Sequence, residues 1–572
     1  MNRTALSASA IALGMPLGAL GQPADLLPPD PSVLPAPERE VSAEPAPGPT
    51  GPVDIAEKTT APGLVLNGIS LDGATALPID RLKPIWADLI GSTVTVATLE
   101  NVAQRIGATY RAEGYILTQA ILPEQTVVNG IVRILVVEGF INNVEITTDN
   151  AAQQRLAQRY FTPIPEDRPL RLSTLERGVL LSRDSFGASV ETVLEPSPDT
   201  FGAANLGVLI EPQPTSWFTT LDNRGSRLYG TWTLSGGSRS YNLLGLNERI
   251  DSLVTVAPDN LSIAYGSATV EIPLAALSGT VLDGARMELS GNISRSDPDL
   301  TQSGTPEELT VTLDESNLRL GMTVPFIRTR SQNLFGRVGI GFRQSDSATD
   351  FDAETGTETT DETDRLVVLD MRATWDIADD FGGVTLLDAA IRKGLDVGGA
   401  RIDYDGPDQP DVDFILATAN LSRLQRLGTD GWALWGEIIG QYAADILPNS
   451  ERFSLGNGTI GRGFAPGNTS GDSGFGLRVE VRKNLYESVV KRHLEATQLY
   501  AFGDYGRARD RSEDRDGEQW ETLASVGIGA RIDIRPWLTL TPEIAHQVRG
   551  QANDTTDTGH ETRFYIGAVA RF

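Results

Sequence analysis

The chain has 572 residues, with 76 acidic and 48 basic side chains, a formal net charge of −28, and no cysteine. The acidic balance argues against nucleic acid as a partner, and a chain without cysteine has no disulfide framework, thiolate metal site or thiol catalyst. The three histidines, His493, His546 and His560, are widely spaced, so the sequence predicts no histidine metal site and no cofactor.

Residues 1–21 predict export. Arg3 precedes a short apolar stretch, and Ala-Leu-Gly stands before Gln22, which is the pattern of a removable signal peptide. Two glycines and a proline interrupt the apolar stretch and disfavour the alternative, a membrane helix. No later stretch is apolar for long enough to form a membrane helix, so any membrane-crossing part must be built from strands. Residues 22–62 are dense in proline and predict an extended, mobile linker.

From residue 63 the composition becomes globular, and the order strand, helix, helix, strand, strand occurs twice. In the first copy, residues 63–140, we expect strands over 64–73, 115–122 and 130–139, and helices over 78–91 and 98–114, the second capped by Thr98. In the second copy, residues 141–213, we expect strands over 141–149, 188–196 and 206–212, and helices over 150–161 and 173–187, with Ser173 and Glu176 as a capping box. Each copy predicts a small two-layer α+β domain.

Residues 214–572 lose helical periodicity and predict strands with one aliphatic face and one charged, glycine-rich face. The segment "FGLRVEVR" shows the alternation, with Phe475, Leu477, Val479 and Val481 on one side. A soluble β-sandwich and a membrane barrel both produce this pattern. Export, strands of about ten residues or more, several charges on each polar face, and a strand that includes Phe572 favour the barrel. The region contains sixteen candidate strands.

A glycine-rich loop interrupts this region after the eleventh candidate strand, at about residues 443–474. In the stretch "TIGRGFAPG", Arg462 stands between Gly461 and Gly463 and is followed by Phe464. The thirteenth candidate strand contains "FGDYG", whose alternation places Phe502, Asp504 and Gly506 on the lumenal face. If the loop folds inward, Arg462 meets Asp504 in a partly dehydrated lumen, and the glycines permit a sharp turn near the wall. The alternative is a surface arginine in a flexible loop.

These motifs resemble those of the two-partner secretion transporters (TpsB family), the haemolysin-activator and filamentous-haemagglutinin transporter type. "SLGNGTIGRGFAPG" is similar to the family's arginine–glycine–aromatic loop motif, "FGDYG" to its strand motif, "LDNRGSRLYG" to its first-strand motif, and "ILPEQTVVNGIVRILVVEG" to the end of its first POTRA domain. The resemblance covers about residues 64–572. Gly461 departs from the family, where an aliphatic residue is expected. The proline-rich segment also departs, because it forms poorly the plug helix that members often carry.

The resemblance implies a mostly β protein, in which two periplasmic α+β POTRA domains precede a sixteen-stranded antiparallel barrel in the outer membrane of a Gram-negative cell. It implies a transporter and not an enzyme, whose partner is a large secreted polypeptide that crosses the pore unfolded. Outer-membrane lipids and the barrel-assembly machinery are further implied partners. Residues 461–464 are then the loop motif in the pore, Phe502, Asp504 and Gly506 the wall motif, and Phe572 the C-terminal barrel signal. Partner contacts are expected in 173–187 and 188–196, where an extended segment can add to a sheet edge.

Two other functions use a barrel of this kind. An outer-membrane assembly insertase of the same superfamily carries more POTRA copies by resemblance, whereas this chain has room for two. A diffusion channel has no need of the POTRA pair. An enzyme is disfavoured, because no histidine stands in a nucleophile-elbow setting and the acidic stretch "DAETGTETTDETD" is better interpreted as a solvated outer loop.

Overall fold

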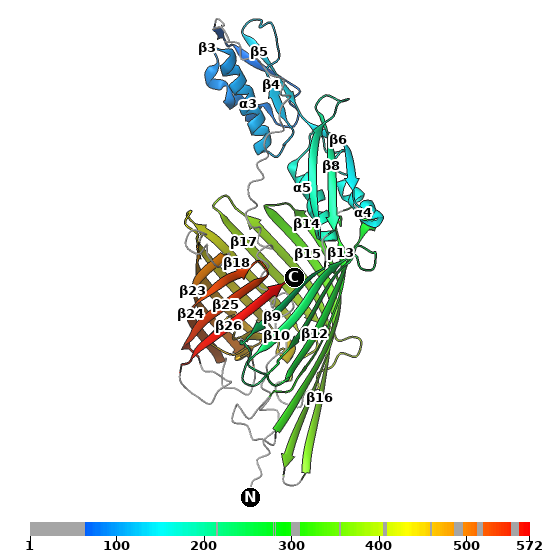
Figure 1. The fold of residues 1–572 in the computed structure, drawn as a ribbon, viewed down its shortest axis with the longest axis vertical. Helices are drawn as coiled ribbons and strands as arrows, with labels where there is room; N and C mark the ends of the chain where they lie inside the picture. Colours follow the sequence, from blue (N-terminus) through cyan, green and yellow to red (C-terminus); the bar gives the residue numbers. More distant parts are fainter. Residues whose placement is uncertain are drawn as a thin grey trace.

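The computed structural model describes residues 63–572, except 213–214, 278–279, 281, 299–308, 354–355, 404–408, 458–459, 486–495, 512–518 and 551–559. The predicted signal peptide, the proline-rich linker with the question of a plug helix, and His493 lie outside these residues. Two small α+β modules stand in a line at one end of a large β-barrel (Figure 1). None of the helices in the described part of the chain is long and apolar enough to cross a membrane.

The first module packs helix α3 (Val96–Ala112) on a three-stranded sheet. The sheet has the order β2 (Gly68–Asp72), β5 (Ile131–Val137), β4 (Gln119–Ile121), and β1 (Leu64–Val65) pairs with β3 (Thr93–Val94) beside it. The face of α3 predicted to be apolar is buried with the sheet around Ile106 and Tyr110.

Two details of the first module differ from the sequence prediction. The helix expected over 78–91 is instead α2 (Ile79–Leu82) followed by the 3-10 turns η3 (Lys83–Ile85) and η4 (Ala87–Leu89), because Pro84 has no amide hydrogen with which to continue an α-helix. The N-cap of α3 is Thr95 and not Thr98, since the Thr95 hydroxyl accepts the Thr98 amide at 3.2 Å.

The second module repeats the architecture with helices α4 (Ala151–Phe161) and α5 (Leu172–Phe186) on the sheet β6 (Phe140–Thr147), β8 (Ala203–Pro212), β7 (Ala188–Pro196). The predicted capping box is wrong. Helix α5 starts after Arg171, whose side chain makes no cap, and the Asp167 carboxylate instead accepts the Arg171 amide at 3.0 Å and the Thr174 hydroxyl at 2.6 Å. Glu176 turns away and accepts the Arg330 amide.

Sixteen antiparallel strands form the closed barrel, as the sequence predicts. They are β9 (Ser216–Asp222), β10 (Thr233–Tyr241), β11 (Arg249–Val256), β12 (Ile263–Pro273), β13 (Arg286–Ser296), β14 (Leu309–Arg328), β15 (Gln332–Ala353), β16 (Gly356–Ala378), β17 (Gly383–Gly394), β18 (Ile415–Leu427), β19 (Trp432–Ala443), β22 (Ser473–Leu485), β23 (Ala496–Asp510), β24 (Gln519–Arg535), β25 (Leu538–Arg549) and β26 (Thr562–Arg571). Phe572 exchanges two backbone hydrogen bonds with Trp217 where β26 meets β9.

The wall has an apolar outer face and a charged inner face. On β22, Leu477, Val479 and Val481 are exposed, whereas Glu480 between them is buried on the inner side. The acidic stretch expected as an outer loop is largely strand, because β15 ends at Ala353 and β16 begins at Gly356. These two strands project beyond the barrel at the end opposite the modules (Figure 1).

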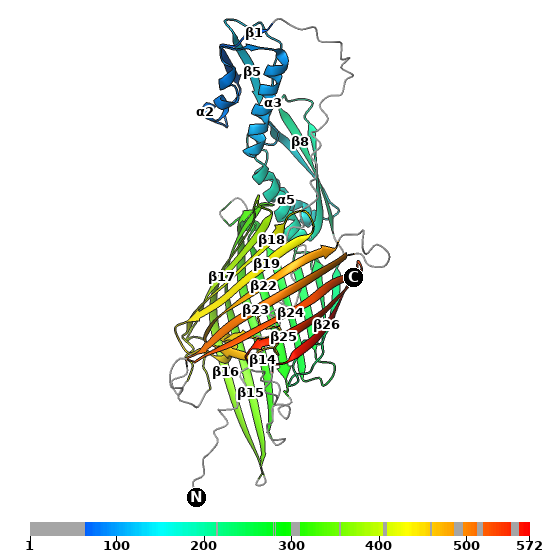
Figure 2. The same cartoon turned by 90° about the vertical axis from the view of Figure 1, so that its left-hand side faces the viewer.

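Helix α5 seats the second module on the turns of the barrel, at the end where the C-terminus lies (Figure 2). Arg177 donates to the carbonyls of Pro325 and Asp283 at 3.0 and 2.9 Å. Asp184 forms a two-point ion pair with Arg328 at 2.7 and 2.8 Å. The barrel therefore occupies much of the helix that the sequence suggested for partner contacts, whereas β7 stands at the edge of its sheet.

Candidate functional site

The loop between β19 and β22 folds into the lumen and packs there on an apolar base. Its short strands β20 (Phe453–Leu455) and β21 (Thr469–Gly471) pair with each other. Leu455, Ile460 and Phe464 are fully buried in one cluster with residues of the inner wall. Burial of these side chains removes apolar surface from the wet lumen and holds the loop inside.

Glycines bring the loop close to the wall where the sequence predicted it. Gly461 has a φ of +91°, which side-chain-bearing residues rarely adopt. A Cβ on Gly463 would lie 3.1 Å from Ser525, and a Cβ on Gly506 of β23 would lie 2.8 Å from Leu455. The absent side chains at 463 and 506 therefore make room for the contact between loop and wall.

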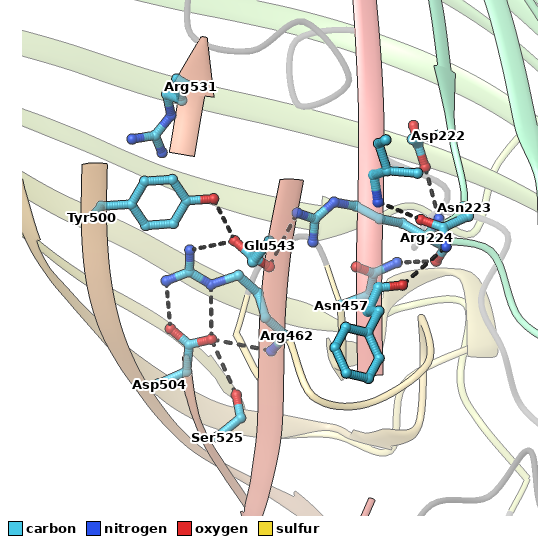
Figure 3. A network of polar contacts seen from close by, with 12 residues as sticks. Asp222, Asn223, Arg224, Asn457, Arg462, Tyr500, Asp504, Ser525, Arg531 and Glu543 are labelled. Atoms are coloured by element: carbon cyan, nitrogen blue, oxygen red, sulfur yellow. Dashed lines mark hydrogen bonds and ion pairs between the residues drawn. The ribbon is translucent and has the colours of Figure 1, made fainter. Parts of the chain in front are cut away.

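Arg462, at the tip of this loop between β20 and β21, forms a buried ion pair with Asp504 of β23. Its Nη2 and Nε lie 3.1 Å from the two carboxylate oxygens, and its backbone amide donates to the same carboxylate at 3.1 Å. The guanidinium carbon also lies over the Phe502 ring, 3.5 Å from the centroid. Ser525 donates a further hydrogen bond to Asp504 (Figure 3). The two-point geometry fixes the orientation of the arginine as well as its position.

Two more carboxylates complete the surroundings of Arg462. Its Nη1 lies 2.8 Å from Glu480 of β22 and 3.4 Å from Glu543 of β25. Burial opposes the charged form of Arg462, but the three carboxylates outweigh that effect and raise its pKa above the usual value. Tyr500 donates its hydroxyl to Glu543 at 2.7 Å. Arg462 is therefore a permanent cation held from three sides.

The network extends to the end of the first barrel strand. Arg224, in the segment that resembles the first-strand motif, lies 3.1 Å from Glu543, and Asn457 of the inward loop donates to the Arg224 carbonyl. Asn223 bridges to β26 by accepting the Ile566 amide at 2.7 Å and donating to the Phe564 carbonyl at 3.0 Å (Figure 3). The loop, the first strand and the last two strands thus meet at one point.

The predicted site residues fall into two groups in space. Residues 461–464, Phe502, Asp504 and Gly506 come together in the lumen, whereas Phe572 lies far along the wall with its ring stacked on Trp537, 6.2 Å between centroids. Sequence reasoning did not single out Glu480, Glu543 or Arg224. The sequence shows only that Glu480 and Glu543 face inward, as many charged residues of the barrel do. To identify these two as partners of Arg462 requires the register of the strands.

The chain matches two family models. Residues 208–532 match the haemolysin secretion/activation protein family ShlB/FhaC/HecB, and residues 64–139 match the ShlB-type POTRA domain. A heme/hemopexin transporter protein, HuxB of Haemophilus influenzae, is 23% identical over 505 residues, covering 86% of this chain and 84% of its own.

Solved structures share the fold, among them the following two. CdiB from Escherichia coli superposes with a TM-score of 0.67 at 20% identity, covering 90% of this chain and 92% of that one. BamA from Haemophilus ducreyi without its POTRA domains 1–3 gives 0.53 at 12% identity, covering 90% of this chain and all of that one.

Proposed function

The chain belongs to the haemolysin secretion/activation protein family ShlB/FhaC/HecB, and from this premise we propose that it carries a large partner exoprotein across the outer membrane by two-partner secretion. The family match across the POTRA domain and the barrel is the observation that carries this function. The barrel supplies the pore, and the POTRA domains recognise the unfolded partner in the periplasm.

The lumen suits the passage of an unfolded chain. Its inner wall carries ion pairs such as Arg372 with Asp388 and Arg249 with Glu271, so exposed peptide groups of a passing chain can stay hydrated. The loop that bears Arg462 occupies part of this space. We propose that the contacts of Arg462 with Asp504, Glu480 and Glu543 fix the loop there and set the resting state of the pore.

The sheet edge at β7 is the place where the second module can accept the partner. Within the described residues β7 pairs only with β8, which leaves its other side without a strand partner. An extended segment can add there through main-chain hydrogen bonds, a mode that tolerates many sequences. Outer-membrane lipids on the aliphatic face and the barrel-assembly machinery, which would act on the strand that bears Phe572, complete the proposed partners.

Secretion in a reconstituted host tests the function. The chain is expressed in a Gram-negative host together with the exported product of the adjacent open reading frame, and that product is measured in the medium with and without the chain. Chain-dependent release supports two-partner secretion. Retention of the product, combined with misassembled porins when the chain is depleted from its own cell, would point to an insertase instead. Steady conductance in planar bilayers without a partner would point to a diffusion channel.

A further inference from the structure

The outer face of the barrel changes from apolar to polar along one row of paired residues. The register joins, strand by strand, Ile293, Ser316, Gln344, Arg365 and Arg401. The adjoining row on the module side is Gly291, Leu318, Phe342 and Val367, and the row on the far side is Arg295, Asp314, Asp346 and Thr363. These rows face outward, because Leu318 and Leu320 are 53% and 48% exposed while Arg319 between them pairs with Asp370 inside.

The part of this row from Ser316 to Arg365 lies at the height of the membrane surface remote from the modules. On β14, Ser316 precedes Arg328 by twelve residues, and Arg328 binds Asp184 of the second module. Twelve residues span about 40 Å along a strand, which a tilt of about 40° reduces to about 30 Å across the membrane. The hydrocarbon core of a bilayer is about 30 Å thick. Ser316 therefore stands where lipid headgroups of the outer leaflet begin, and Arg365, thirteen residues before the module-side end of β16 at Ala378, stands at a similar height.

Two arginines stand side by side in this row. The backbones of Arg365 and Arg401 exchange hydrogen bonds of 2.7 and 2.8 Å, so the two residues are directly opposite and their side chains leave the same face. Both residues are exposed. Like charges in this position repel each other, and among the described residues no carboxylate forms an ion pair with either. An anion between them would remove the repulsion.

An apolar groove of about 650 Å³ ends at Arg365, which stands opposite Arg401. Its sides include the exposed outward side chains of Val254, Ile293, Leu318 and Phe342, and its far end reaches Arg365 and Ala400. Its floor contains the small residues Gly266, Ala268 and Gly291. A hydrocarbon chain fits the groove, and a negative group fits its end.

We propose that the groove and the arginine pair bind one phosphorylated lipid of the outer leaflet. An acyl chain lies between Val254 and Phe342, and the phosphate lies between Arg365 and Arg401. Guanidinium groups bind phosphate through paired hydrogen bonds, and two of them at the end of a groove select an anionic headgroup. The site requires only that the barrel spans the membrane, and it is independent of the secreted partner.

Lipid titration of the purified full chain tests the site. Native mass spectrometry in detergent compares diphosphorylated lipid A with dephosphorylated lipid A. We expect the wild type to prefer the phosphorylated form by about tenfold and the variant Arg365→Gln/Arg401→Gln to lose that preference. Arg295→Gln is the matched control, since Arg295 is an outward arginine with its own partners, Asp297 at 3.6 Å and Asp314 at 4.0 Å. The control should keep the preference.

A second variant tests the groove separately. A side chain at Gly266 has room, since the nearest atom to its Cβ is 3.9 Å away, so Gly266→Leu should weaken both lipids about equally and keep the preference. Equal binding of both lipids by the wild type, or an unchanged preference in the double variant, would overturn the proposal. Displacement of the lipid by an equal concentration of inorganic phosphate would show an anion site without a lipid. If the double variant does not fold, Arg401→Gln alone should reduce the preference by about threefold, and no reduction counts against the site.

Discussion

Arg224 and Arg462 share one carboxylate, that of Glu543, at 3.1 and 3.4 Å. Arg224 follows the first barrel strand and Arg462 lies at the end of the inward loop, so a single side chain of β25 connects the closure of the barrel to the position of the loop. A change at Glu543 therefore acts on two parts of the molecule at once.

Replacement of Arg462 by alanine should abolish or sharply reduce secretion while the barrel still inserts. The change leaves buried Asp504 without its two-point partner and with the more distant Arg478, whose Nε lies 3.9 Å away, which costs up to about 3–5 kcal/mol locally. Asp504→Ala should give a similar defect, and the double variant should be little worse than either, because coupled residues are not additive. Two quantities are measured: the amount of partner in the medium, and the heat-dependent shift in electrophoretic mobility that a folded barrel shows. Arg372→Ala, an inner-wall arginine paired with Asp388, should secrete normally.

Glu543→Gln should loosen the inward loop without unfolding the barrel. Glutamine still accepts the Tyr500 hydroxyl but has no charge with which to hold Arg224 and Arg462. The chain has no cysteine, so a single reporter, Ser454→Cys in β20, can report exposure of the loop to maleimide. We expect faster labelling in Glu543→Gln than in the parent. Equal labelling rates would show that Asp504 and Glu480 hold the loop without help from Glu543.

Gly506→Ala should displace the loop, whereas Gly503→Ala on the same strand should have no effect. A Cβ at 506 would lie 2.8 Å from Leu455 and 2.9 Å from Ile460, whereas a Cβ at 503 has nothing within 4 Å. Overpacking of this kind costs about 1–3 kcal/mol. Secretion and maleimide labelling of Ser454→Cys distinguish the two variants. A defect of equal size in Gly503→Ala would mean that β23 tolerates no added side chain on either face.

The first module should lose stability in acid. Burial opposes ionisation of Glu138, but the amides of Ala76 and Thr75 and the Thr75 and Tyr110 hydroxyls outweigh it and lower the pKa of its carboxyl below 4.5. The stabilisation is therefore complete above pH 4.5 and is lost as the pH falls through the lowered value.

The measurement is a urea titration of the full chain at pH 7 and pH 3.5, followed through the fluorescence of Trp86, which is buried in that module and identified by subtraction of Trp86→Phe. Glu138→Gln should lower the midpoint by an amount equivalent to about 1 kcal/mol at pH 7 and less at pH 3.5. An equal loss at both values would mean that the charge of Glu138 does not contribute.

Local alternation along the strands predicted the barrel and placed Asp504 on the lumenal face. The glycines beside Arg462 were a weak signal alone, and the strand motif downstream and the two α+β domains upstream favoured its pair with Asp504. Glu480 and Glu543 were not predictable, since their convergence depends on the register of β22 and β25 relative to β23. The continuous helix predicted over 78–91 is interrupted at Pro84. The predicted N-cap of α3, Thr98, lies three residues after the observed N-cap, Thr95. Arg401 follows an irregular segment, so no sequence period could place it beside Arg365.

The acidic residues of the projecting hairpin of β15 and β16 affect how copies of the protein associate with each other. Strand β16 pairs with β17 only from Val368 onward and with Arg401 at Arg365, so within the described residues its stretch before Arg365 has no strand partner on that side, and such an edge invites strands of a neighbouring molecule to join it. Asp361, Glu362 and Asp364 line this stretch. Two copies that approach each other in the membrane therefore present like charges along this unpaired strand edge. The repulsion between these charges disfavours edge-to-edge self-association.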